Sequence, residues 1–422
     1  LKYKDFSNLN KINIYEVDDV QKKLKEEDIF LYITHQQGLL VYMITNKDVR
    51  VSVEVESHAE LVMDQIKLAT TSIKEGDNLI YKGFLSALYK QIFTFVKPHL
   101  NNKKNIYIVT DKYFSELPFE LLITNGEPEK LLNELKLKGP NANYVKEFKP
   151  IFLVENYNIS YHPSVNSFVE LGETKKESIL KSANFLGFGN PKFSDKSENI
   201  EVAKKLNKMN KILLNNRGYL NDSRVINERY EEIPFTKIEL NEISSLFKKS
   251  KLYLGQNASE VKVKNMNLLN YDVISFATHA EVSGTFEDFN EPFLVLTPPN
   301  KTSELNDGLL TSSEISKLKM NAKLVILSAC NTASKESKYA MGFSGLINSF
   351  FMAGTDAVIA THWPVEDKAG YLLVSETIKK IINQKLLKSE ALRETKLEFI
   401  AGKYGDEYKH PFYWAPYILI GN

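Results

Sequence analysis

The stretch LVILSACNTA, residues 324–333, holds the single cysteine of this 422-residue chain. Its first four residues form an apolar run that is typical of a buried strand, and the run stops at small and polar residues. A second run, DVISFAT (272–278), ends in the same way and is followed by His279. Apolar runs without alternation are typical of parallel strands, whose carboxyl ends form sites. We therefore predict two neighbouring strands that bring His279 and Cys330 to one edge of a sheet.

The elements around these two runs alternate between helix and strand. Expected helices cover residues 236–247, 258–266 and 342–354, and expected strands cover 183–191, 251–255 and 356–363. This order predicts an α/β fold with a mostly parallel central sheet and helices on both of its faces.

The N-terminal part has a different pattern. Three β-branched and aromatic runs predict an antiparallel meander, followed by two helices and a further strand, at 29–34, 39–45, 49–55, 57–74, 78–97 and 106–110. The polar, turn-rich residues 124–149 then suggest a boundary. We expect a supporting α/β subdomain over residues 1–150 and the main domain over 151–422, with a strand pair at 151–164 and a surface insertion at 192–232.

Composition excludes several classes of function. The 54 Lys and Arg residues balance the 53 Asp and Glu residues, so nothing demands a nucleic-acid partner. No apolar run is long enough to span a membrane and no signal peptide opens the chain. One cysteine excludes a disulfide framework and a zinc ribbon, and it fits the reducing cytoplasm. The first residue, Leu1, suggests a fragment of a longer protein or a processed product. We predict no cofactor and no metal.

The residue types at the two strand ends suit nucleophilic catalysis. A thiol is mostly protonated near neutral pH, and a histidine within reach can activate it and then protonate the leaving amine. The histidine lies 51 residues before the cysteine, a spacing known from caspases. Backbone N–H groups of Ala280 and Cys330 are our candidates for an oxyanion hole. The alternative is structural, because a lone cysteine is often a small buried hydrophobe.

Several motifs together resemble the CHAT domain, a caspase-like peptidase domain often fused to tetratricopeptide repeats. The resemblance rests on VISFATHAEVSG, LVILSACNTA, GLINSFFMAGTDAVIATHWPVED and HPFYWAPYILIGN, with ELPFELL, YNISYHPS and FLGFGNP further upstream. It covers nearly the whole chain and is most specific over 272–422.

This resemblance implies a caspase-like three-layer sandwich whose supporting subdomain is itself pseudo-caspase-like. It implies a cysteine endopeptidase with His279 as general base and acid and Cys330 as nucleophile. It further implies a regulated bacterial effector protease, used in defence, that cuts a specific partner protein when an upstream repeat region or sensor activates it. Family members often have glycine after the histidine, where this chain has Ala280. The caspase motif QACRG is absent, so aspartate specificity does not follow.

The loop THWPVEDKAG (361–370) follows the next strand, where caspase-like folds build part of their specificity pocket. His362 and Trp363 are candidate pocket residues, with a backbone-bonded histidine and a packing tryptophan as the alternatives. Glu366 and Asp367 would accept a basic substrate residue, although acidic residues at this place are also ordinary at the start of a helix.

Two other functions use the same residues. A catalytically silent interaction scaffold with the caspase fold would retain the architecture alone. A cysteine-dependent acyl transferase or amidase acting on a small molecule would need the same dyad and a closed pocket.

Overall fold

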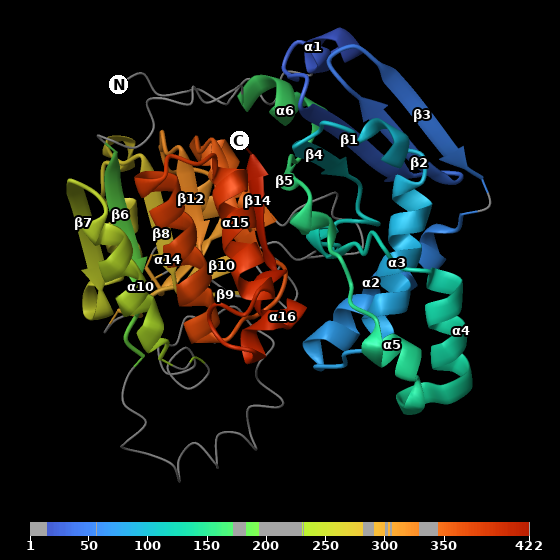
Figure 1. Cartoon of the computed structure of the whole chain (residues 1–422). Helices are drawn as coiled ribbons and strands as arrows, with labels where there is room; N and C mark the ends of the chain where they lie inside the picture. The colour runs from blue at the N-terminus through green and yellow to red at the C-terminus, as the bar shows by residue number, and fades with distance from the viewer. Residues whose placement is uncertain are drawn as a thin grey trace. The chain divides into compact units, whose positions relative to one another are not determined.

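The structure is a computed structural model (Figure 1). It describes residues 15–55, 57–171, 183–193, 230, 232–281, 291–299, 303, 306–328 and 345–421. Within these ranges the chain divides into two compact units, one over 12–174 and 383–422 and one over 175–382. The division into domains at residue 150 stays a prediction.

The first unit contains a mixed sheet in the order β3-β2-β1-β4-β5-β14. Its strands are β1 (Asp28–His35), β2 (Leu39–Ile44), β3 (Val49–Glu54), β4 (Asn105–Thr110), β5 (Asn158–Tyr161) and β14 (Tyr417–Gly421). The strands β1, β2 and β3 are antiparallel neighbours, which confirms the predicted meander. The strands β4 and β5 continue the sheet in parallel, as do β5 and β14.

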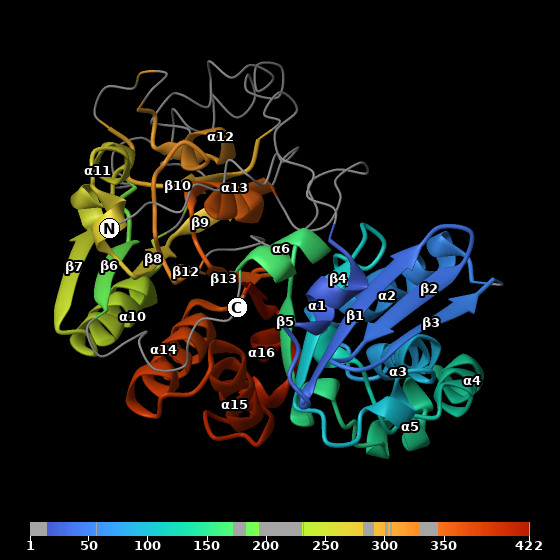
Figure 2. The same cartoon turned by 90° about the horizontal axis from the view of Figure 1, so that it is seen from above.

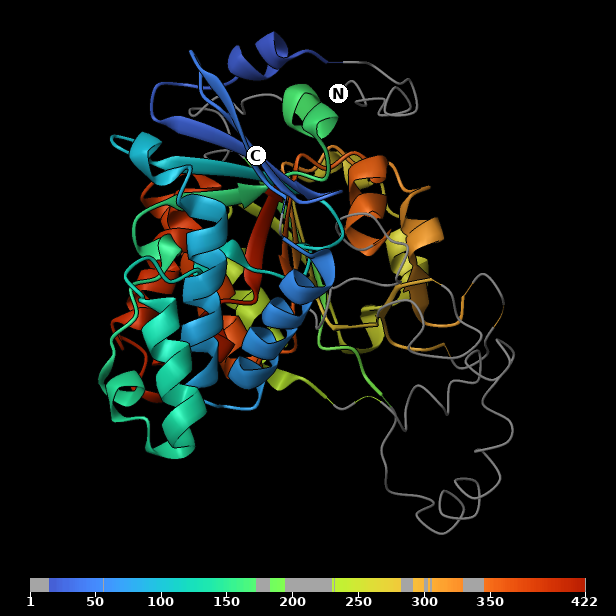
Figure 3. The same ribbon diagram turned by 90° about the vertical axis from the view of Figure 1, so that its right-hand side faces the viewer.

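Helices cover both faces of this sheet (Figures 2 and 3). One face carries α1 (Val17–Gln21) and α6 (Val165–Leu171), and the other carries α2 (Ala59–Lys74), α3 (Ile80–Phe93), α4 (Pro128–Lys138) and α5 (Asn143–Glu147). The helices α15 (Lys388–Ile400) and α16 (Pro411–Trp414) complete the unit. The predicted helices at 57–74 and 78–97 are therefore confirmed as α2 and α3.

The predicted strand pair at 151–164 was half wrong. The segment forms a short 3₁₀ turn at Leu153–Glu155 and one strand, β5. The carbonyl groups of Val154 and Glu155 accept hydrogen bonds from the Arg393 guanidinium of α15. A contact from more than two hundred residues away thus fixes a segment that local pattern assigns to a strand.

The second unit contains a parallel sheet in the order β13-β12-β8-β6-β7. Its strands are β6 (Asn184–Gly189), β7 (Lys249–Leu254), β8 (Val273–Ala277), β12 (Leu324–Leu327) and β13 (Ala357–Thr361). Every residue of β8, β12 and β13 is buried, as expected for parallel strands covered on both faces.

The covering helices lie on the two faces of this second sheet. Figure 2 shows α10 (Pro234–Ser245) and α14 (Asp367–Asn383) on one face, and α11 (Glu260–Lys264) and α13 (Gly345–Ala353) on the other. A small antiparallel sheet of β9 (His279–Glu281), β10 (Phe293–Val295) and β11 (Leu309–Thr311) and the short helix α12 (Ser312–Ile315) complete the unit. The predicted fold class, a three-layer α/β fold with a mostly parallel sheet and helices on both faces, is confirmed.

None of the helices that the structure describes is long and apolar enough to cross a membrane.

Candidate functional site

The strands that precede His279 and Cys330 are hydrogen-bonded neighbours. The strands β8 and β12 run parallel, with Phe276 opposite Leu327, and the N–H of Ser328 donates to the Phe276 carbonyl at 3.1 Å. His279 and Cys330 each follow three residues after this aligned pair. The predicted neighbouring strands are confirmed, while Cys330 itself lies outside the described residues.

His279 opens strand β9, directly after β8. It is half-buried and lies opposite Val295 of β10. The centre of its ring is 5.2 Å from that of Tyr230 and 5.8 Å from that of Phe193. These aromatic rings limit the directions that the imidazole can take.

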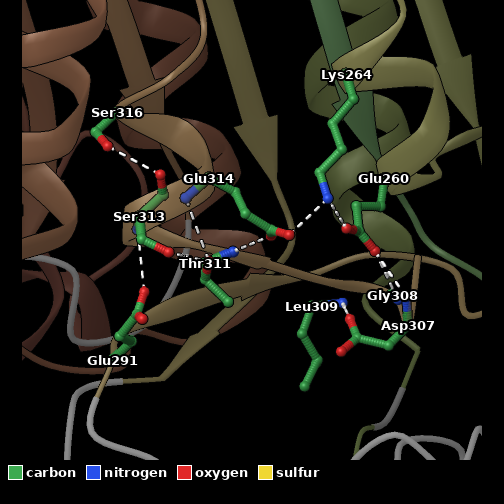
Figure 4. A network of polar contacts seen from close by, with 10 residues as sticks. All are labelled: Glu260, Lys264, Glu291, Asp307, Gly308, Leu309, Thr311, Ser313, Glu314 and Ser316. Carbon is green, nitrogen blue, oxygen red and sulfur yellow. Dashed lines mark hydrogen bonds and ion pairs between the residues drawn. The ribbon is translucent and has the colours of Figure 1, made fainter. Parts of the chain in front are cut away.

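The small sheet that carries His279 is anchored by a buried carboxylate on α11 (Figure 4). The Oε2 atom of Glu260 accepts hydrogen bonds from the N–H groups of Asp307 and Gly308, both at 2.9 Å. Its Oε1 atom pairs with Lys264, whose ammonium also binds Glu314 at 2.6 Å. The helix α11 therefore holds both the residues that enter β11 and the helix α12 that follows it.

Further polar contacts tighten the same region. Burial raises the pKa of Asp307 to about 7, and its Oδ1 atom accepts from the N–H of Leu309 at 2.8 Å. Glu314 and Thr311 cap each other's backbone at the start of α12. Since β11 pairs with β10 and β10 with β9, the network fixes the position of the strand that begins at His279.

A buried acid on α10 reaches the carboxyl end of β12. The Oε1 atom of Glu239 accepts a hydrogen bond from the Oγ of Ser328 at 2.8 Å, and the Glu239 side chain is buried, with 1% of the residue exposed. Burial raises the pKa of Glu239 to about 8, and the nearby Asp367 carboxylate shifts it in the same direction. Glu239 is therefore mostly protonated at neutral pH. Its partner Ser328 lies two residues before Cys330 in the sequence.

Glycines in β6 allow α10 to approach this closely. A Cβ atom at Gly189 would lie 2.6 Å from a methyl group of Leu240 on α10 and 2.8 Å from the Ala277 carbonyl of β8. Any larger residue would push the helix away from the strand ends.

The predicted pocket residues occupy two different environments. His362 and Trp363 follow β13 and are both buried, with ring centres 6.5 Å apart. Glu366 is exposed, and Asp367 is the first residue of α14. The helix-start interpretation of Asp367 is thus confirmed, and the role of all four as pocket residues stays a prediction.

Asp367 also connects α10 with the histidine. Its Oδ2 atom accepts from the N–H of Phe235 at the start of α10, at 2.9 Å. Burial raises the pKa of Asp367, against the Phe235 hydrogen bond and the positive charge of His279, which both lower it. By the same interaction, an ionised Asp367 favours the protonated imidazole of His279.

The oxyanion candidate Ala280 is buried in β9 opposite Leu294, and its role stays a prediction. Within the described ranges, no group of three or more His, Cys, Asp and Glu side chains is arranged to hold a metal ion.

Sequence reasoning missed Glu239, Ser328 and Tyr230. A signal for Glu239 existed, because it occupies the same helical stripe as Thr236, Leu240 and Ile243, all of which are buried. An acidic residue in an apolar stripe indicates either a buried partner or a functional role.

The chain is similar to several known proteins. The family model of the CHAT domain matches residues 82–422. Mouse tetratricopeptide repeat protein 28 is 29% identical over 118 residues, which is 28% of this chain and 5% of that protein. The human protein of the same name is 30% identical over the same length. The chain therefore corresponds to a small fraction of these curated relatives.

Two solved structures are similar. The separase–securin complex of Saccharomyces cerevisiae aligns with 99% of this chain and 32% of that chain, at 12% identity and a TM-score of 0.46. The Arg-specific cysteine proteinase gingipain R aligns with 94% of this chain and 78% of that chain, at 8% identity and a TM-score of 0.46.

Proposed function

The chain belongs to the CHAT domain family, and from this we propose that it is a cysteine endopeptidase with His279 as general base and acid and Cys330 as nucleophile. The observation that carries the proposal is the register of β8 and β12. It aligns Phe276 with Leu327, three residues before the histidine and three before the cysteine, on neighbouring parallel strands. Two residues at equal distance beyond an aligned pair are suited to act together.

The chemistry proceeds in two steps. His279 takes the proton of the Cys330 thiol, and the thiolate attacks the carbonyl carbon of the scissile peptide bond. The C–N bond then breaks, the amine leaves with the proton from His279, and a thioester remains. Water attacks this thioester, again with His279 accepting the proton, and releases the carboxylic acid and the thiol. Backbone N–H groups of Ala280 and Cys330 would stabilise the oxyanion in both steps.

Asp367 supports the dyad through charge. Its carboxylate interacts with the charge of His279, which favours the imidazolium that forms when the thiol is deprotonated. The other role, in which Glu366 and Asp367 receive a basic substrate residue, uses the same carboxylate, with His362 and Trp363 as further pocket residues. A pocket role for Asp367 would alter substrate preference and leave thiol ionisation unchanged.

The biological setting is also a proposal. We infer a specific partner protein as the substrate and an upstream tetratricopeptide-repeat region or sensor as the activator. The relatives in mouse and human carry such repeats in their names. A regulated effector protease of bacterial defence, acting in the cytoplasm, fits the family and the single cysteine.

The test is the pH dependence of Cys330 alkylation by a small thiol reagent. The chain has one cysteine, so every label reports Cys330. We expect an inflection well below the ordinary value of about 8.5, which moves back towards that value in His279→Ala. The exposed His58 provides the control, since His58→Ala should match the wild type.

A second arm uses mass spectrometry of a peptide library incubated with the chain. Cleavage that is lost in Cys330→Ala supports the peptidase. An inflection at or above the ordinary thiol value that is unchanged in His279→Ala contradicts the dyad and favours the silent scaffold.

A further inference from the structure

We propose that β3 is a self-association strand, through which two copies of this chain pair antiparallel with Arg50 of each copy opposite Glu54 of the partner subunit. The proposal is independent of catalysis, because it concerns the outer strand of the first unit. In the part of the chain that the structure describes, β3 ends its sheet (Figure 2), and no strand pairs with its outer edge.

The side chains of β3 leave an apolar face exposed. Val49, Val51 and Val53 are 42%, 49% and 54% exposed, and Tyr42 of β2, opposite Val51, is 36% exposed. Natural edge strands usually carry charged side chains, especially lysine, or a proline or a bulge that hinders pairing with another chain. The strand β3 (VRVSVE) has no lysine, proline or bulge, and its charged residues, Arg50 and Glu54, have opposite signs, so they can pair between two copies.

The backbone of β3 shows which groups are available. The N–H of Thr45 donates to the carbonyl of Asp48 at 2.9 Å, which makes these opposite residues a hydrogen-bonded pair. Such pairs alternate along an antiparallel ladder. Asp48, Arg50, Ser52 and Glu54 therefore direct their backbone groups towards β2, and the three valines direct theirs outward, towards a second copy.

The charges select one register for the pairing. When Ser52 lies on the two-fold axis, Val51 is opposite Val53 of the partner subunit, and both have outward backbone groups. Arg50 is then opposite Glu54 of the partner subunit, twice in the dimer. Opposite charges in such positions stabilise strand pairing, and like charges destabilise it.

The neighbouring registers do not pair Arg50 with Glu54, and one centred on Val53 places Arg50 opposite position 56, beyond the end of β3. A pairing centred on Val51 places Asp48 opposite Glu54 of the partner subunit. A pairing centred on Arg50 places two arginines opposite each other, and one centred on Glu54 places two glutamates opposite each other. The exposed ion pair of Arg50 with Asp48 within one chain, at 3.0 Å, is weak enough for Arg50 to exchange partners.

The first experiment is sedimentation equilibrium of the full chain with charge-swap variants. We expect a dimer for the wild type. Arg50→Glu and Glu54→Arg should each weaken the dimer at least tenfold, and the double swap should restore its dissociation constant to within about threefold. Lys136→Glu on α4, an exposed charge reversal outside β3, should leave the dimer unchanged.

A cross-link tests the register directly. In the proposed pairing, Ser52 faces Ser52 of the partner subunit in a non-hydrogen-bonded position, where Cβ atoms approach closely enough for a disulfide. In a Cys330→Ser background, Ser52→Cys should form a disulfide-linked dimer under mild oxidation, whereas Arg50→Cys should not. A monomeric wild type, or a dimer indifferent to the charge swaps, overturns the proposal. Efficient cross-linking of Arg50→Cys without Ser52→Cys excludes this register and also overturns it.

Discussion

The carboxyl group of Glu239 on α10 accepts a 2.8 Å hydrogen bond from the hydroxyl of Ser328, the residue directly after β12. This contact connects a helix that covers the sheet with the strand end that leads to Cys330. At the start of α10, the N–H of Phe235 donates a hydrogen bond to the Asp367 carboxylate. This carboxylate interacts with the charge of His279. The helix α10 therefore contacts both the carboxylate that interacts with His279 and the strand end that leads to Cys330.

The first prediction concerns the pH dependence of stability. Burial raises the pKa of Glu239 to about 8, so the folded chain keeps a proton that the unfolded chain releases above its ordinary pKa of 4.5. The contribution of Glu239 to the free energy of unfolding is fully present below pH 4.5. It is lost as the pH rises towards 8, by up to about 1.4 kcal/mol per pH unit. Glu239→Gln removes this contribution. Urea unfolding followed by tryptophan fluorescence should therefore show a shallower decline from pH 5 to 8.

Glu242, on the same helix, provides a control because its pKa is shifted in the opposite direction. Burial acts to raise its pKa, but hydrogen bonds from Lys379 and Tyr371 outweigh it and hold the pKa below the usual value. Glu242 therefore contributes stability above its unfolded pKa that is lost in acid, and Glu242→Gln should reduce stability mainly at neutral pH. If the free energy of unfolding declines equally steeply from pH 5 to 8 in the wild type and in Glu239→Gln, Glu239 is ionised in the folded chain and the prediction is wrong.

The second prediction tests the close approach of α10 to the sheet. Gly189→Ala places a methyl group 2.6 Å from Leu240 and 2.8 Å from the Ala277 carbonyl, and backbone atoms have little freedom to move. We expect the free energy of unfolding to fall by about 1–3 kcal/mol, as measured by urea titration. Gly83 is the fourth residue of α3, and in Gly83→Ala the new atom meets side-chain atoms of Leu132, with no backbone atom closer than 3.7 Å. The helix gains about 1 kcal/mol from alanine, so Gly83→Ala should cost little. Equal losses in the two variants would contradict the argument.

Parts of the fold were predictable because the signals were local. Long apolar runs identified β8 and β12, and turn residues between β-branched runs identified the meander of β1, β2 and β3. The end of the apolar run at 272–278 predicted that His279 lies just beyond a strand, and the structure places it there, after β8. These features depend on periodicity and on chain order, which a sequence displays directly.

Other parts depend on contacts between distant residues. The pattern predicts the helix over 236–247, but it does not reveal which strand end that helix covers, and so it hides the pairing of Glu239 with Ser328. The turn at Leu153–Glu155 is held by Arg393, far along the chain. Most of the predicted insertion 192–232 lies outside the described residues, as does Cys330.

The third prediction concerns the anchor of the small sheet (Figure 4). Glu260→Ala leaves the N–H groups of Asp307 and Gly308 without their acceptor and should lower the free energy of unfolding by about 3 kcal/mol. Glu260→Gln keeps a carbonyl acceptor and should lose about 1 kcal/mol. Differential scanning calorimetry checks both. If alanine and glutamine have the same small effect, the carboxylate does not anchor β11.

The fourth prediction concerns a buried ion pair in the first unit. The ammonium of Lys396 lies 3.0 Å from the Oε1 atom of Glu120, and the Tyr161 hydroxyl donates to the other carboxylate oxygen at 2.5 Å. Both charged side chains are almost fully buried. Lys396→Met leaves the Glu120 charge without its cation and should destabilise the chain by about 3–5 kcal/mol.

Two further variants separate this cost from a simple loss of packing. Lys396→Met combined with Glu120→Gln removes the uncompensated charge and keeps an acceptor for Tyr161, so most of the lost stability should return. Lys403→Met breaks the exposed ion pair with Glu398, at 3.0 Å, and should cost less than about 1 kcal/mol. Urea unfolding at pH 7 measures all three. If the double variant is as unstable as Lys396→Met alone, the damage comes from the shape of the methionine, and the buried charge of Glu120 is not its cause.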